Sequence, residues 1–344
     1  MTDDAHRVLA DARAARVFPA AVAEVGDSAD VLWRDAFGTQ TFDEGTPIDV
    51  HTPFDLASLT KVIATTTVVM HLVDTAALAL DEPIWASFPE WRGPDRGPAV
   101  VRDLLEHSSG LAARLLDAPP AGRREFEHDI CTMPLEYAPR TRSVYSDLGF
   151  ILLGFLAADR GRAPLAAQFD ALWGDPMLTF DLPAGARRRA APTLPEQDDA
   201  RRGRRLQGEV HDNYAAVLGA AGHAGLYGTV PAVGTFARTV LHAAHGAEGP
   251  APFSAARVAE FTTRSAVPGS SRALGWDTML PTSSCGTRMS GLAFGHVGYT
   301  GGSLWIDPAR DRYFVLLTNR AQGGGSLDQM RTVRRAFHDA LGDV

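Results

Sequence analysis

Segments with the pattern of β-strands lie near the two ends of this 344-residue chain, and a long stretch of helical pattern separates them. Two short apolar runs at residues 18–25 and 31–37, joined by a polar turn that contains Gly and Asp, predict a hairpin. Strand-like runs return after residue 271. The order predicts an α+β fold in which one antiparallel sheet is built from both chain ends, with a cleft between this sheet and the helical middle.

We expect one unit over residues 1–344 that has two lobes. Lobe 1, about 1–80 and 250–344, would hold the sheet with N- and C-terminal helices, and lobe 2, about 81–249, would be a mainly helical insertion. The predicted helices cover residues 3–16, 58–77, 101–106, 148–158, 165–173, 230–245 and 326–341, and the late strands cover 272–280, 290–297, 301–307 and 312–318. Residues 181–208 are rich in Pro and Arg with acidic residues among them, which predicts an exposed insertion and not a nucleic-acid patch.

Lys61 is the only lysine in the chain. Arginine stays charged at any accessible pH, whereas a desolvated lysine can release its proton and act as a base. Ser58 precedes Lys61 by three residues, and positions i and i+3 share one face of a helix, so the two side chains could meet. A base in that place would activate the serine hydroxyl as a nucleophile. The alternative is a surface lysine with a serine nearby by chance.

Two further segments contain groups that acyl transfer requires. Tyr145-Ser146-Asp147 precedes an apolar helix, and a tyrosine there could act as acid or base if a neighbouring ammonium lowers its pKa. The alternative is a core tyrosine followed by a helix-capping aspartate. The glycine-rich segment 296–302 could bring a strand edge close to a substrate, so that one of its amides and the amide of Ser58 form an oxyanion hole. An ordinary Gly-rich hairpin is the alternative here.

The segments Ser58-Leu59-Thr60-Lys61, Tyr145-Ser146-Asp147 and His296-Val297-Gly298 resemble, in the same order, the SxxK, YxN and [KH]xG boxes of the serine β-lactamase and penicillin-binding-protein superfamily. The sequence is most similar to the class C β-lactamase-like branch, which includes D-alanyl-D-alanine carboxypeptidases, D-aminopeptidases and esterases. The similarity extends over about residues 15–340 and implies a β-lactamase/transpeptidase-like fold. By this resemblance, Ser58 would be the acylated nucleophile and Lys61 its activating partner.

The same resemblance assigns the remaining steps of an acyl transfer. Tyr145 would pass protons to the leaving group and assist deacylation, and the backbone amides of Ser58 and Tyr299 would form the oxyanion hole.

The chain departs from the family's pattern at two positions. Asp147 stands where Asn is usual, and its charge would stabilise the Lys61 ammonium and disfavour nearby substrate carboxylates. His296 stands where lysine is usual. Because a histidine is only partly charged at pH 7, it would bind a substrate carboxylate more weakly than a lysine would. With Gly298, these residues would bind or support the substrate. Both departures favour esters or amides over efficient β-lactam hydrolysis.

We therefore expect a serine hydrolase that forms an acyl-enzyme on a small ester or amide, as an esterase or a D-amino-acid peptidase would, with weak activity on β-lactams. A DD-carboxypeptidase or a β-lactamase proper is the first alternative, and an inactive ligand-binding scaffold of the same fold is the second. The given chain has no signal-peptide pattern and no apolar run of transmembrane length, which predicts a cytoplasmic protein.

Composition limits the partners of the protein. The net charge of −8 and the pI near 5.8 argue against nucleic acid, and we expect a small-molecule substrate, no membrane and an undetermined oligomeric state. We expect no cofactor, and no metal site because the singled-out histidines lack HxH or HxxxH spacing.

Several other polar residues are predicted to be structural. His107 should bond backbone carbonyls at a helix end, His211 and His223 should hold loops although they could line the cleft, and Asp55 could cap the helix of Ser58. The two cysteines, Cys131 and Cys285, should be buried free thiols, while a disulfide between them stays open.

Overall fold

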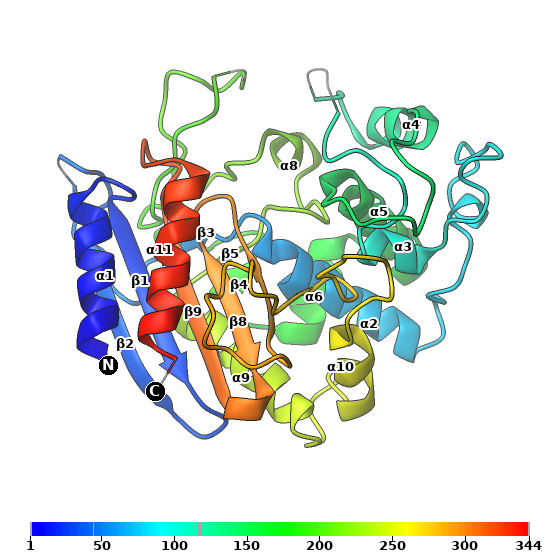
Figure 1. The fold of residues 1–344 in the computed structure, drawn as a ribbon. Coiled ribbons are helices and arrows are strands. Elements are labelled where there is room, and N and C mark those ends of the chain that lie inside the picture. The colour runs from blue at the N-terminus through cyan, green and yellow to red at the C-terminus, as the bar shows by residue number, and fades with distance from the viewer. Residues whose placement is uncertain (1, 44, 116–118, 198, 343–344) are drawn as a thin grey trace.

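The computed structural model describes residues 2–43, 45–115, 119–197 and 199–342 (Figure 1). The strands are β1 (Ala20–Gly26), β2 (Val31–Gly38), β3 (Phe54–Asp55), β4 (Leu178–Thr179), β5 (Tyr227–Gly228), β6 (Asp277–Thr278), β7 (Phe294–Val297), β8 (Ser303–Asp307) and β9 (Arg312–Thr318). The α-helices are α1 (Thr2–Ala14), α2 (Thr66–Asp74), α3 (Val101–Leu105), α4 (Arg123–Thr132), α5 (Asp147–Gly161), α6 (Leu165–Trp173), α7 (Ala184–Arg187), α8 (Asn213–Leu218), α9 (Val230–Ala244), α10 (Ala255–Thr262) and α11 (Leu327–Ala340). A π-helical turn η1 (Lys61–Thr65) and 3-10 turns η2 (Ile84–Ala86) and η3 (Pro308–Arg310) complete the set.

The main sheet is assembled from both ends of the chain, as the sequence predicts. Its six strands have the order β2-β1-β9-β8-β7-β6, and each neighbouring pair is antiparallel. A smaller sheet has the order β3-β5-β4. The strand predicted at 272–280 is much shorter in the structure: the backbone turns back at Gly275 (φ 86°), and β6 comprises only Asp277–Thr278.

Helices cover both faces of the main sheet (Figure 1). Along β9, Phe314 and Leu316 belong to the cluster formed with α1 and α11, whereas Tyr313 and Val315 belong to the larger core that includes α9. This two-residue alternation is the pattern of a strand buried on both faces. Helix α9, which the sequence assigns to lobe 2, packs on strands of predicted lobe 1. The boundary between the lobes at residue 249 stays a prediction.

The helix that follows Ser58 differs from its predicted range of 58–77. Its first turn is the π-helical η1, and the regular helix α2 ends at Asp74. The Thr66 hydroxyl donates to the Lys61 carbonyl at 2.8 Å, and such side-chain bonds compete with a regular helical ladder. The other long predicted helices agree with the structure to within a few residues. In the described part of the chain, no helix has the length and apolar character needed to cross a membrane.

Most described residues of segment 181–208 are exposed, as its composition predicts, but several are buried and anchor it to the protein. It contains α7, and Ala190, Thr193 and Leu206 are buried. The Ala191 amide donates to the Pro53 carbonyl at 2.8 Å, so this segment is fixed to the chain just before β3. Its arginines are partly neutralised locally, because Arg201 forms an ion pair with Asp199 at 2.6 Å. Apolar and charged contacts therefore fold this segment against the body of the protein.

Candidate active site

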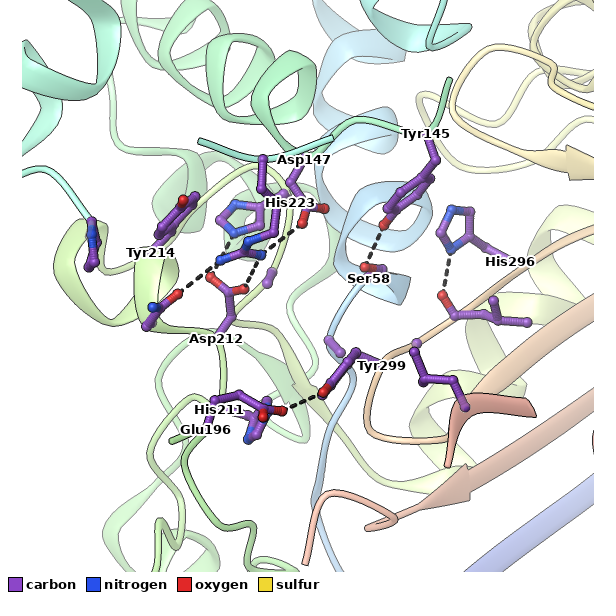
Figure 2. A pocket seen from close by; sticks show the side chains of 18 of the residues that line it. Ser58, Tyr145, Asp147, Glu196, His211, Asp212, Tyr214, His223, His296 and Tyr299 are labelled. Atoms are coloured by element: carbon purple, nitrogen blue, oxygen red, sulfur yellow. Dashed lines mark hydrogen bonds and ion pairs between the residues drawn. The ribbon is translucent and has the colours of Figure 1, made fainter. Parts of the chain in front are cut away.

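A cavity of about 820 Å³ is lined by side chains from several distant segments (Figure 2). Ser58 comes from the turn before η1, and Tyr145 and Asp147 come from the start of α5. His296 lies on β7, and Tyr299 lies in the turn that follows it. The fold thus brings to one cavity residues from all three sequence boxes. Its volume falls within the range of small-molecule sites.

Ser58 is in hydrogen-bond contact with both predicted partners. Its Oγ lies 3.1 Å from Lys61 Nζ and 2.6 Å from the hydroxyl of Tyr145. Lys61 is completely buried, and its side chain reaches back from η1 to the serine. A nucleophile and two groups that can move protons are therefore within one hydrogen bond of each other, which is the geometry that nucleophilic catalysis requires.

To one side of Ser58, five residues form a closed circuit of hydrogen bonds and ion pairs, which we call the charged ring: Lys61, Asp147, Arg114, Asp212 and His223 (Figure 2). Lys61 Nζ donates to Asp147 Oδ1 at 2.8 Å, and Arg114 donates to Asp147 Oδ2 at 2.9 Å and to Asp212 Oδ2 at 2.8 Å. His223 Nε2 donates to Asp212 Oδ1 at 2.8 Å. The circuit closes where Lys61 Nζ donates to the backbone carbonyl of His223 at 2.9 Å. Each carboxylate in the ring is thus held by two cationic or N–H donors.

The charged ring controls the protonation of its members. Burial alone would lower the pKa of Lys61, but Asp147 and Tyr145 outweigh it and raise that pKa above the ordinary value. Burial would raise the pKa of Asp147, but Lys61, His223 and Arg114 together lower it. The ring therefore favours a lysine ammonium and an aspartate carboxylate. The idea that burial makes Lys61 readily deprotonated is not supported.

Tyr145 is half-buried, and its ring lies beside those of two histidines that remain neutral. Burial raises the pKa of Tyr145. The Lys61 ammonium lowers it, as expected for a neighbouring cation, but does not outweigh burial, so the pKa is raised overall. The ring of His107 lies 4.8 Å and that of His296 5.9 Å from the Tyr145 ring. Burial and the positive charges of Arg272 and Lys61 hold the pKa of both histidines well below its usual range.

The predicted oxyanion donors lie on two turns that approach each other closely. The backbone amides of Ser58 and Tyr299 form no hydrogen bond within the described residues. The Tyr299 carbonyl accepts a hydrogen bond from Arg320 Nε at 3.0 Å, which helps to hold this turn in place. A Cβ on Gly298 would lie 2.7 Å from the Leu56 carbonyl oxygen, so only glycine lets the two turns come this close.

The remaining predicted residues have the following places. His296 lines the cavity, its Nδ1 donates to the Val297 carbonyl at 2.8 Å, and its buried Nε2 has no partner within the described residues. His107 does hold the backbone, but its Nδ1 accepts from the Ser146 amide at 3.0 Å and bonds no carbonyl. His211 and His223 both hold loops and line the cavity.

Two capping assignments differ from the structure. Asp55 does not cap the Ser58 helix, because it lies in β3 and its carboxylate accepts the amide of Ala57 at 2.8 Å. The cap of α5 is Ser146, whose hydroxyl accepts the Gly149 amide at 3.3 Å, so Asp147 is free to join the charged ring. The two cysteines are both buried and free, as predicted.

The sequence did not identify Arg114, Asp212 or Arg272 as site residues. Arg114 and Asp212 meet across 98 positions of the chain, and no local spacing signals such a pair. The available signal was that Asp212 belongs to the segment His211-Asp212-Asn213, which could line the cleft or hold a loop, with the loop role favoured. Arg272 lies over the Tyr145 ring at 5.4 Å, and its nearest carboxylate is that of Asp277, at 4.0 Å. Within the described residues, no group of three or more His, Cys, Asp and Glu is arranged to hold a metal ion.

Comparison with known proteins places this site in a family context. A family model described as Beta-lactamase matches residues 5–338. The N-acetylmuramyl-L-alanine amidase of Bacillus subtilis (strain 168) is 28% identical over 343 aligned residues, which cover 88% of this chain and 77% of that protein.

Solved structures agree over nearly the whole chain. EstCE1, a hydrolase with promiscuous acyltransferase activity, matches with a TM-score of 0.77 at 18% identity and covers 98% of both chains. A class C β-lactamase from Rhodobacter sphaeroides matches with a TM-score of 0.76 at 18% identity, over 98% of this chain and 99% of that one. These matches confirm the predicted β-lactamase/transpeptidase-like α+β fold.

Proposed function

Because the chain belongs to the β-lactamase family, whose members are serine hydrolases, we propose that it hydrolyses a small ester or amide through a covalent acyl-enzyme on Ser58. The observation that carries this proposal is the contact of Ser58 Oγ with Lys61 Nζ at 3.1 Å and with the Tyr145 hydroxyl at 2.6 Å. The family acts on β-lactam, peptide or ester substrates, and the proposal selects among these.

Lys61 acts in this proposal as a fixed positive charge. Its Nζ has three acceptors: Ser58 Oγ, Asp147 Oδ1 and the His223 carbonyl. An ammonium has three N–H donors and no acceptor, so it can donate to all three oxygens at once, whereas a neutral amine would donate to two of them and accept a hydrogen bond from the Ser58 hydroxyl. The raised pKa of Lys61 is consistent with this charge state. We therefore revise the sequence-based expectation that Lys61 itself takes the serine proton.

Tyr145 is the group that moves the proton. In the fraction of molecules with an ionised phenol, its oxygen accepts the Ser58 proton while Ser58 Oγ bonds to the carbonyl carbon, and the carbonyl π-electrons move onto its oxygen. The amides of Ser58 and Tyr299 donate to this oxyanion. Tyr145 then gives the proton to the leaving group, whose bond to carbon breaks. A water molecule then attacks the acyl carbon while Tyr145 takes its proton, the bond from that carbon to Ser58 Oγ breaks, and Tyr145 returns the proton to Ser58.

Esters and amides are proposed above β-lactams for an electrostatic reason. His296, at the position where a lysine is usual, is kept neutral by its burial and by nearby cations, so it offers no full charge to a substrate carboxylate. Asp147 adds a negative charge beside the nucleophile. An esterase or a D-amino-acid peptidase therefore fits the cavity better than an efficient β-lactamase.

The test combines a covalent probe with a substrate panel. Intact-protein mass spectrometry after treatment with a fluorophosphonate should show one adduct, which the Ser58→Ala variant should lack. Hydrolysis of p-nitrophenyl acetate or butyrate, or of D-aminoacyl amides, should exceed that of nitrocefin. Folded protein with neither an adduct nor turnover would refute the proposal. Nitrocefin turnover above ester turnover by orders of magnitude would refute the substrate ranking alone.

A further inference from the structure

Asp55 is a buried carboxylate next to the nucleophile that the proposed chemistry does not use. Only 4% of the residue is exposed, and it lies in the short strand β3. Its Oδ1 accepts the backbone amide of Ala57 at 2.8 Å, and its Oδ2 accepts that of His211 at 2.6 Å. Both oxygens are thus occupied by main-chain N–H groups. One of these groups lies immediately before the nucleophilic serine.

The same residue is linked to the second turn of the oxyanion hole. The backbone carbonyl of Asp55 accepts the Thr300 hydroxyl at 2.8 Å, and Thr300 follows Tyr299 directly. Thr300 is itself buried. Asp55 therefore contacts the residue before Ser58 through its side chain and the residue after Tyr299 through its main chain. No other feature described above connects the two turns through a single residue.

The backbone before Ser58 requires such support. Ala57 has φ 47°, in the left-handed region that residues with a Cβ seldom adopt. An Asp side chain that bonds the amide two residues later stabilises a tight turn of this kind. The Ala57 bond to Asp55 therefore fixes the orientation of the following peptide, whose N–H is that of Ser58.

We propose that Asp55 is a positioning residue that holds the amides of Ser58 and Tyr299 in register as one oxyanion hole. This inference rests on the proposed function, since it concerns the transition state of the same acyl transfer. Asp55 contacts neither the substrate nor the reacting atoms. Its effect is exerted through Ala57 and Thr300. Small displacements of oxyanion donors are costly, because these donors bind charge that exists only in the transition state.

The test replaces Asp55 with Asn. Asparagine has the same shape but only one acceptor oxygen, so either the Ala57 or the His211 amide would face an NH₂ group. We expect kcat per active site, titrated with fluorophosphonate, to fall about 10- to 100-fold while KM changes by less than about threefold. A loss caused only by unfolding would lower the number of titratable sites and leave kcat per site unchanged.

Two further variants make the test decisive. Asp103→Asn is the control, because Asp103 is also buried and also accepts a main-chain amide, that of Val100 at 2.9 Å. It also pairs with Arg140 at 2.9 Å, and it bonds neither turn of the oxyanion hole. Thr300→Val keeps the side-chain shape, removes the other link, and should lower kcat by a smaller factor. Wild-type protein without activity would refute the proposed function. Active wild type with unchanged kcat per site in Asp55→Asn and Thr300→Val, or an equal loss in Asp103→Asn, would refute the positioning role alone.

Discussion

The two sides of Ser58 differ in how their charges are balanced. On one side lies the charged ring, where every carboxylate oxygen that was described has a cationic or N–H partner at 2.8–2.9 Å. On the other side lie Tyr145 and His296 (Figure 2), and the ring of His107 is 4.8 Å from that of Tyr145. Apart from Arg272, which lies over the Tyr145 ring, this cluster is uncharged, and the Nε2 atoms of the two histidines are buried without a partner in the described chain. Ser58 thus lies between the charged ring, whose charges are fixed, and Tyr145, whose phenol can gain or lose a proton.

This contrast assigns different tasks to the two sides. Charges that are held by several hydrogen bonds stay in place during a reaction, so the ring can stabilise a developing anion without rearranging. A tyrosine in uncharged surroundings is costly to ionise, and the adjacent Lys61 ammonium is what reduces that cost. The comparison predicts that Lys61 and Tyr145 act as one unit, and that changes in the ring alter the pH dependence of activity.

The largest expected effect comes from separating this unit. Tyr145→Phe removes the proton acceptor, and Lys61→Met removes the charge with an unbranched side chain of similar length. Each should lower kcat/KM for a p-nitrophenyl ester by about 10²- to 10⁴-fold. The double variant should be little worse than the poorer single one, because residues that act together give non-additive losses. Losses that multiply in the double variant would show that the two groups act independently.

The next largest effect is a shift of the pH profile. Burial raises the pKa of Tyr145, the base in the proposed mechanism, so the fraction of sites with an ionised phenol grows with pH, and kcat/KM should still rise above pH 8. Asp147→Asn removes a negative charge that also raises this pKa. The rising limb should therefore move to lower pH by about 1 to 3 units. Measuring kcat/KM between pH 5 and pH 10 for the wild type and for Asp147→Asn gives this shift. A rising limb at the same pH in both would contradict the role of the charged ring in setting the pH dependence.

Arg114→Gln should move the same limb in the opposite direction and by less. Arg114 partly neutralises Asp147, so its removal strengthens the influence of that carboxylate on Tyr145 and raises the pKa of the phenol further. The Arg114 side chain is 37% exposed, and solvent screening should limit the shift to less than about one pH unit. The same pH series measures this shift. A limb that moves to lower pH in Arg114→Gln would mean that Arg114 acts on the base by another route.

Local sequence patterns predicted the parts of the molecule that depend on short-range order. The hairpin of β1 and β2, the helix α6 and the last strand β9 follow from periodicity and turn residues. Ser58 and Lys61 were expected to meet because three residues separate them, and they do so at 3.1 Å even though η1 is not a regular α-helix. Such pairings need no information from the rest of the chain.

The charged ring could not be predicted in the same way. Arg114 bonds Asp147 across 33 residues and Asp212 across 98 residues, and a long-range ion pair imposes no periodicity on the sequence. Asp147 was noticed as a departure from the family's Asn, but Arg114, which bonds its carboxylate, was not. The direction of the pKa shift of Lys61 depends on that tertiary arrangement, because burial and ion pairing act in opposite directions.

The smallest expected effect tests the uncharged side directly. His296→Lys restores the residue type usual in the family, yet position 296 is 2% exposed and lies near Arg272 and Lys61. The same burial and positive charges that keep His296 neutral would lower the pKa of the new amine. We expect the ratio of kcat/KM for a carboxylate-bearing ester to that for a neutral ester to rise less than about threefold. A rise of tenfold or more would show that this side of Ser58 can hold a full positive charge, and that its neutrality is a property of histidine and not of the site.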